Sequence, residues 1–181
     1  MKTWNSGKEQ DKIIRGLERQ EKQQAYQQDR FLKFKLNEIH RNLVQTLLME
    51  KIVETENPAA ISDAILNGLK KAMNSEEFDL QYFVAPIRGL VPRPNPYSLY
   101  MTQFIMEVLI DNPEVVEIYG TDLDIYKVVN KVFSQISIRF ERTEEEIKSQ
   151  LAHNQSLIPG SREYEIALDE LMRKKLGEPE K

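Results

Sequence analysis

The sequence contains no cysteine and little glycine. Without cysteine, the 181-residue chain can form no disulfide, no thiolate metal site and no cysteine nucleophile. Its seven glycines, at positions 7, 16, 68, 89, 120, 160 and 177, are never closer than nine positions. Phosphate loops, dinucleotide-binding turns and glycine-flanked serine nucleophiles need glycines within about six residues, because the backbone must approach the ligand closely. The sequence therefore excludes these three kinds of site.

Histidine is also scarce, with only His40 and His153 present. A di-metal carboxylate site in a helical bundle needs Glu three residues before His, whereas Asn37 and Gln150 occupy those positions. The acidic residues at 141–146 are explained by the preference of helix starts for carboxylates. We therefore predict no metal, no cofactor and no catalytic residue, and we expect both histidines to be surface or boundary residues.

A long hydrophobic run is missing as well. The longest apolar-looking segment, FIMEVLI, is short and carries Glu107, and the start MKTWNSGKEQDK is polar where a signal peptide needs an apolar region. These features predict a cytoplasmic protein without a membrane span. Charge is uneven along the chain: residues 1–51 carry eleven Lys or Arg against seven Asp or Glu, a net charge of +4, and residues 52–181 carry fourteen against twenty-two, a net charge of −8.

Proline positions and helix caps predict an all-α fold. Asn-Pro occurs at Asn57, Asn95 and Asn112, where Asn can cap a helix and Pro suits its first position. Thr143 to Glu146 fits a capping box, and Thr121 to Asp124 is a weaker version of the same motif. We predict helices at 8–53, 58–73, 76–85, 96–111, 113–119, 122–137, 144–155 and 162–176. One alternative is an antiparallel strand pair, because residues 115–120 and the alternating QISIRF at 135–140 also fit strands.

The apolar faces predict a bundle with an extended arm. The helix at 96–111 is apolar on two sides, as expected for a central helix buried between neighbours. The predicted helix at 8–53 has a regular apolar seam, formed by Leu32, Leu36, Ile39, Leu43 and Leu47. Before this seam the chain is rich in Gln and has little apolar area. We therefore predict a polar helical arm at 1–29, a helical bundle domain at 30–177 and a C-terminal tail at 178–181.

The face opposite the seam is the clearest surface anomaly. It carries Arg30, Phe34, Asn37 and Arg41, with Lys33 nearby, so an aromatic side chain lies where a solvated helix should be polar. Phe34 could cover a neighbour within the same chain. The same residues could instead anchor a protein partner, or grip phosphates and stack a nucleic-acid base.

The proline-rich segment GLVPRPNPYSLY, at 89–100, has two interpretations. Arg88, Arg93, Tyr97 and Tyr100 could line a groove for an acidic or extended ligand. The favoured interpretation is a connector across one end of the bundle, with both tyrosines packed inward.

These patterns favour a non-enzymatic interaction or assembly protein, an adaptor or structural subunit that acts through its N-terminal helix. The expected partner is another protein or a second copy of the chain, docked by a coiled coil or a similar helical contact. Nucleic-acid binding through the Arg30, Lys33, Phe34 and Arg41 face is the alternative. An active site assembled from residues far apart in the sequence also remains open.

Overall fold

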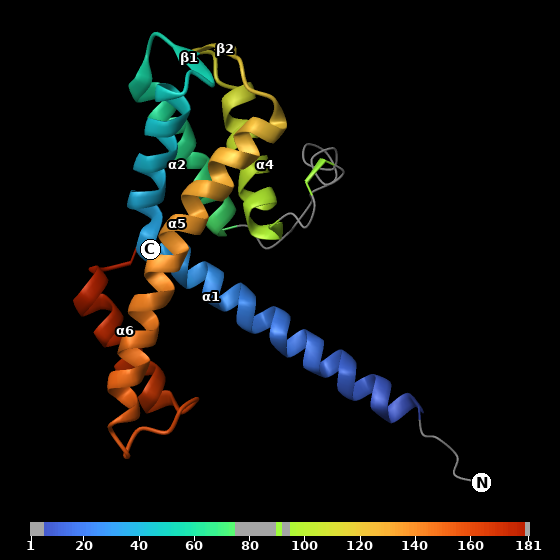
Figure 1. The fold of residues 1–181 in the computed structure, drawn as a ribbon, viewed down its shortest axis with the longest axis vertical. Helices are drawn as coiled ribbons and strands as arrows, with labels where there is room; N and C mark the ends of the chain where they lie inside the picture. The colour runs from blue at the N-terminus through green and yellow to red at the C-terminus, as the bar shows by residue number, and fades with distance from the viewer. Residues whose placement is uncertain (1–5, 75–89, 92–94, 180–181) are drawn as a thin grey trace.

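The computed structural model describes residues 6–74, 90–91 and 95–179, and these form mainly helices. The helices are α1 (Ser6–Met49), α2 (Pro58–Asn74), α4 (Pro96–Ile110), α5 (Asp122–Ala152) and α6 (Arg162–Leu176). Two short strands, β1 (Val53–Thr55) and β2 (Val115–Ile118), join at one end of the molecule (Figure 1). The predicted all-α bundle is confirmed. The helix predicted at 76–85 lies outside the described residues.

The core lies between the C-terminal half of α1, α2, α4 and the first half of α5. The predicted seam of α1 is buried there, with Leu36, Ile39, Leu43 and Leu47 fully enclosed and Leu32 nearly so. The helix α4 packs against both α2 and α5, as expected for the central helix. Its buried residues include Leu99, Met101, Ile105 and Leu109.

A glycine allows α2 to approach α4 closely. Gly68 is buried in α2, and a Cβ atom at this position would lie 3.2 Å from the backbone oxygen of Phe104 and 3.1 Å from a methyl carbon of Val108. A Cβ atom here would require Val108 or the backbone of α4 to shift by a few tenths of an ångström, so the absence of a side chain allows this close contact.

The predicted helix starts are confirmed at three caps. The side chain of Asn95 accepts hydrogen bonds from the backbone N–H groups of Tyr97 and Ser98, and Asn57 accepts one from Ala60. Thr121 and Asp124 form a complete capping box, in which each side chain accepts a bond from the other residue's backbone N–H. These caps satisfy N–H groups that have no partner within the helix.

The predicted break between helices 122–137 and 144–155 is wrong, because α5 runs unbroken from Asp122 to Ala152. Thr143 lies inside the helix, where its hydroxyl donates to the carbonyl of Arg139 instead of capping a new start. The strand alternative at 135–140 is wrong for the same reason, and Ile138 faces solvent. The apolar stripe continues through this region in Ile136, Phe140, Ile147 and Leu151 at helical spacing.

The predicted helix at 113–119 is also wrong. The Asn112 side chain accepts a bond from the Glu114 N–H and closes a turn, and the chain then enters β2. The strand alternative for 115–120 is confirmed, but the partner strand is β1, because Val53 pairs with Ile118 and Glu54 with Glu117 in an antiparallel register. Accordingly α1 ends at Met49 rather than at residue 53.

Two parts of the molecule extend away from this core. The N-terminal half of α1 continues in a straight line away from the other helices and ends far from them (Figure 1). The second half of α5 leaves the core in another direction, and α6 folds back along it (Figure 1). The buried residues of this hairpin include Ile147 and Leu151 on α5 and Tyr164, Leu168 and Met172 on α6.

Candidate functional site

The face of α1 that carries Arg30, Phe34, Asn37 and Arg41 lies where α1 and α5 cross. It follows directly on the projecting N-terminal part of α1. Phe31 is buried there, and its ring lies edge-on to Phe140, with ring centroids 5.4 Å apart, and to Phe133, with centroids 6.3 Å apart. Phe34 is partly buried, and its ring centroid is 6.2 Å from that of Phe140. Of the interpretations considered for Phe34, the contact with a neighbour in the same chain is the one that this packing supports. That neighbour lies in the second half of α5, which covers part of this face.

The polar residues of the same face divide into two groups. Arg30 and Lys33 are partly buried, whereas Asn37 and Arg41 are exposed. The adjacent Glu38 accepts a hydrogen bond of 2.7 Å from the guanidinium of Arg139 on α5. The predicted residues thus occupy one region of α1, but Phe34 already has a partner within its own chain.

Three residues at this crossing were missed in the sequence. They are Phe31, Glu38 and Arg139, which join α1 to α5 by ring packing and an ion pair. The spacing of Phe31 and Phe34 was the available signal, because two aromatics three residues apart on a helix form a second apolar patch beside the leucine seam.

His40 connects α1 to α2. Its Nε2 atom lies 2.7 Å from the carbonyl oxygen of Ser62 and 3.1 Å from the Ser62 hydroxyl oxygen. A carbonyl oxygen can only accept, so Nε2 carries a proton and donates it. These contacts of His40 with Ser62 join α1 to α2.

The two tyrosines of the proline-rich segment pack inward. The Tyr100 ring is buried edge-on against Phe104, and Tyr97 is partly buried against Phe133 in the same geometry. This packing agrees with the favoured interpretation, in which both tyrosines face inward, since Tyr100 belongs to the core and Tyr97 packs against it. Arg88 and Arg93 lie outside the described residues.

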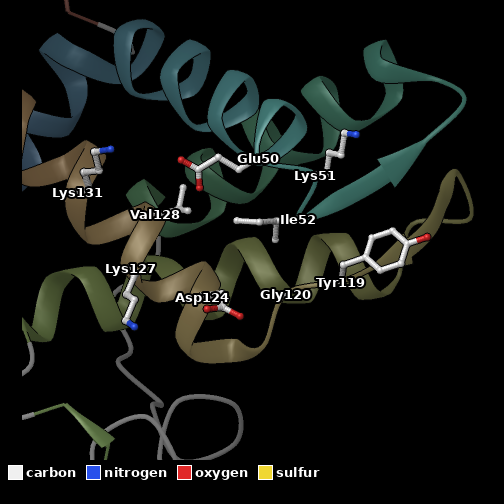
Figure 2. Close-up of a pocket in the computed structure, with 9 residues that line it drawn as sticks. All are labelled: Glu50, Lys51, Ile52, Tyr119, Gly120, Asp124, Lys127, Val128 and Lys131. Atoms are coloured by element: carbon white, nitrogen blue, oxygen red, sulfur yellow. The ribbon is translucent and has the colours of Figure 1, made fainter.

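An open pocket of about 440 Å³ lies beside the two-stranded sheet. Its wall comes from residues 50–52 after α1, residues 119–120 after β2, and one face of α5 between Asp124 and Lys131. Figure 2 shows Ile52 and Val128 at its centre, with Lys51 on one side and Lys127 and Lys131 on the other. Its volume falls in the usual range for small-molecule sites. None of the predicted site residues lines it.

Two carboxylates near this pocket, those of Asp124 and Glu54, accept hydrogen bonds from their neighbours. The backbone N–H and the hydroxyl of Thr121 donate to Asp124, and these hydrogen bonds lower the pKa of its carboxyl group. Tyr119 also lines the pocket; its hydroxyl donates to Glu54, and this bond together with the nearby negative charge raises the pKa of the phenol. Both groups are exposed, so their charges remain screened by water.

The comparisons with known proteins assign a family description to only part of this structure. Residues 96–178 match the model of a family described as a protein of unknown function (DUF507). The match begins with α4 and ends just after α6, so it includes the α5 wall of the pocket but neither α1 nor α2. No curated protein and no solved structure matches the chain.

Two further findings concern the described residues alone. Within residues 6–74, 90–91 and 95–179, no group of three His, Asp or Glu side chains is arranged to hold a metal ion. The described helices also include none with the length and apolar character needed to cross a membrane.

Proposed function

We propose that this protein is a non-enzymatic interaction or assembly protein, an adaptor or a structural subunit. The N-terminal part of α1 docks onto a protein partner or onto a second copy of the chain. The observation that supports this proposal is the position of residues 6–29, which continue α1 away from the other helices (Figure 1). Among the side chains whose burial the structure describes, Phe31 is the first in the chain that belongs to the core.

A projecting helix of this kind has a physical need for a partner. Residues 6–29 form a helix about 36 Å long at a rise of about 1.5 Å per residue. Helices without tertiary contacts are only marginally stable in water, because most helical stability in proteins comes from packing an apolar face. The sequence of the arm offers a narrow apolar stripe at Ile13, Ile14, Leu17 and Ala25, which suits one partner helix better than a broad core.

The crossing of α1 and α5 provides a rigid base for the arm. Phe31 and Phe34 pack on Phe140, and Glu38 accepts a hydrogen bond from Arg139. The residues that directly follow the arm are therefore attached to α5. A rigid base lowers the entropy lost on docking, because the direction of the arm is set before the partner arrives.

Nucleic-acid binding through Arg30, Lys33, Phe34 and Arg41 is the alternative. Stacking a base would require an open face of the Phe34 ring, yet this ring is partly buried against Phe140. The remaining cations could contact phosphates, but they are few, and residues 52–181 carry a net charge of −8. These features favour a protein partner.

The proposal is tested by two matched substitutions in the full chain, Leu17→Lys and Gln23→Lys. Each adds one positive charge to the arm, but helical periodicity places Leu17 on the apolar stripe and Gln23 away from it. Sedimentation equilibrium over a range of concentrations should show self-association of the unaltered protein and of Gln23→Lys. Leu17→Lys should associate at least about tenfold more weakly, because a lysine on the stripe would have to be buried.

Equal association of the two variants would contradict the proposal. A parallel gel-shift series with single-stranded and duplex DNA at low and high salt tests the alternative. Binding that falls steeply with salt and weakens in Arg30→Ala and Arg41→Ala would favour nucleic acid over protein as the partner.

A further inference from the structure

The pocket in Figure 2 has a mixed character that suits an anionic ligand with an apolar part. Its centre is formed by Ile52 and Val128, which are 8% and 5% exposed. Lysines 51, 127 and 131 stand at its rim, and all three are exposed. Within the described part of the chain, none of their three ammonium groups forms a side-chain hydrogen bond or an ion pair, although the charge of Lys127 helps to lower the pKa of Asp124.

Two carboxylates also line the pocket, so the balance of charge must be considered. Asp124 directs one carboxylate oxygen to the backbone N–H and the hydroxyl of Thr121, at 2.9 Å each. It also belongs to the first turn of α5, where the helix dipole offsets part of its negative charge. Glu50 is the other carboxylate, and it is exposed at the end of α1. The three ammonium groups therefore outweigh the two carboxylates.

The backbone at Lys51 is a second, independent observation. Lys51 has φ of 55°, and it is the one non-glycine residue with positive φ among those that the structure describes. It ends α1 in a Schellman motif, since the Ile52 N–H donates to the Leu47 carbonyl and the Lys51 N–H to the Leu48 carbonyl. Glycine is the usual residue at this position, because any Cβ is strained there by about 1 kcal/mol or more.

Lys51 therefore brings a lysine side chain to the pocket rim from a strained backbone position. Glycine at this position would give a more stable fold. Strained backbone clusters at binding and active sites, so the outlier at Lys51 supports a role for its side chain beyond stability. The opposite wall is equally constrained, because a Cβ at Gly120 would lie 2.7 Å from the Ile52 side chain. The pocket is thus shaped by one residue that must be small and by one that is strained.

We propose that this pocket is a binding site for a small organic anion, a phosphate or carboxylate attached to a small apolar group. The acidic group contacts the ammonium groups of Lys127 and Lys131, which lie one turn apart on α5. The ammonium group of Lys51 adds a third positive charge from the other side of the pocket. The apolar group lies on Ile52 and Val128. This site is separate from the arm, and its ligand does not depend on the proposed function.

Three small compounds test this assignment by NMR titration of the full chain. Phenyl phosphate carries both the charge and the apolar group, inorganic phosphate only the charge, and phenol only the ring. Phenyl phosphate should bind most tightly and shift the amide signals of Gly120, Lys127 and Lys131. Equal affinities for phenyl phosphate and inorganic phosphate, or shifts spread evenly over lysines elsewhere, would overturn the proposal.

Two double variants control for general charge effects. Lys127→Ala/Lys131→Ala removes two cations from the rim, and Lys70→Ala/Lys71→Ala removes two exposed cations from α2. The first should weaken phenyl phosphate binding at least about tenfold, because charge-assisted contacts to the phosphate are lost. The second should leave the affinity unchanged. The same affinity in both double variants would refute the site.

Lys51→Gly separates binding from folding. Removing the strained Cβ should raise Tm by about 2–4 °C, and removing the ammonium should weaken phenyl phosphate binding several-fold. A variant that folds better but binds less well cannot be explained by damage to the structure. Unchanged affinity in Lys51→Gly would remove this residue from the site and contradict the inference drawn from its backbone.

Discussion

Replacing Phe31 by alanine should destabilise the protein by about 3 kcal/mol. Phe31 is 6% exposed, and its ring packs edge-on against Phe140 and Phe133. Core Phe→Ala substitutions cost about 3–5 kcal/mol, through lost burial and the cavity left behind. The lower end of that range applies because Phe31 lies at the border of the core, where the neighbouring Arg30 is partly exposed and the surroundings can relax.

Phe34→Ala is the matched control for this substitution. Phe34 has the same side chain, but it is only partly buried and has one ring contact, with Phe140. We expect a loss of about 1 kcal/mol, in line with its partial burial. Urea unfolding followed by circular dichroism gives both values, provided that the slope with denaturant is unchanged. A loss below about 1 kcal/mol for Phe31→Ala, or equal losses for both variants, would refute the packing described at the crossing of α1 and α5.

Four other substitutions test local features of the fold. Thr121→Ala should lower the free energy of unfolding by about 1 kcal/mol, because it removes a helix cap. Thr143→Ala should leave that free energy unchanged or raise it slightly, because Thr143 lies inside α5. Equal losses of stability in thermal unfolding would refute the continuity of α5. Hydrogen bonds to Asp124 lower its carboxyl pKa below the ordinary value of 3.8, so its stabilising effect is complete above that pH and is lost as the pH falls through the folded pKa. The stability difference between the unaltered protein and Asp124→Ala should therefore shrink in acid unfolding below about pH 4, and a difference that stays constant would contradict this linkage. Glu117→Lys should stabilise the strand pair by about 0.2–1 kcal/mol, because Glu117 faces Glu54 directly across the strands, and a loss of stability would argue against that register.

The sequence predicted those features that depend on local spacing. The leucine seam of α1 was found because Leu32 to Leu47 repeat at steps of three and four residues, and every member is buried. The caps at Asn57, Asn95 and Thr121 were found because capping chemistry involves residues within one turn.

Features that depend on long-range packing were missed. Three interpretations of Phe34 stayed open in the sequence, because nothing in the sequence of α1 reveals that α5 crosses there. The apparent break near Thr143 arose from a real capping pattern whose preference is overridden by the apolar stripe on both sides of it. The strand β1 is three residues long, too short for its periodicity to be recognised.

The pocket was not predictable from the sequence for a similar reason. Its residues come from 50–52, 119–120 and 124–131, and no motif connects these segments. The left-handed backbone of Lys51 also gives no sequence signal, because lysine is not the residue expected in that conformation.

The central claim is that the N-terminal part of α1 carries the contact to a partner. Light scattering across a range of concentrations, applied to the full chain and to a shortened chain that begins at Gln28, tests this claim most directly. The full chain should have a mass that rises above that of one copy with concentration, and the shortened chain should stay at the mass of one copy. The same number of copies in both proteins at every concentration would contradict the claim.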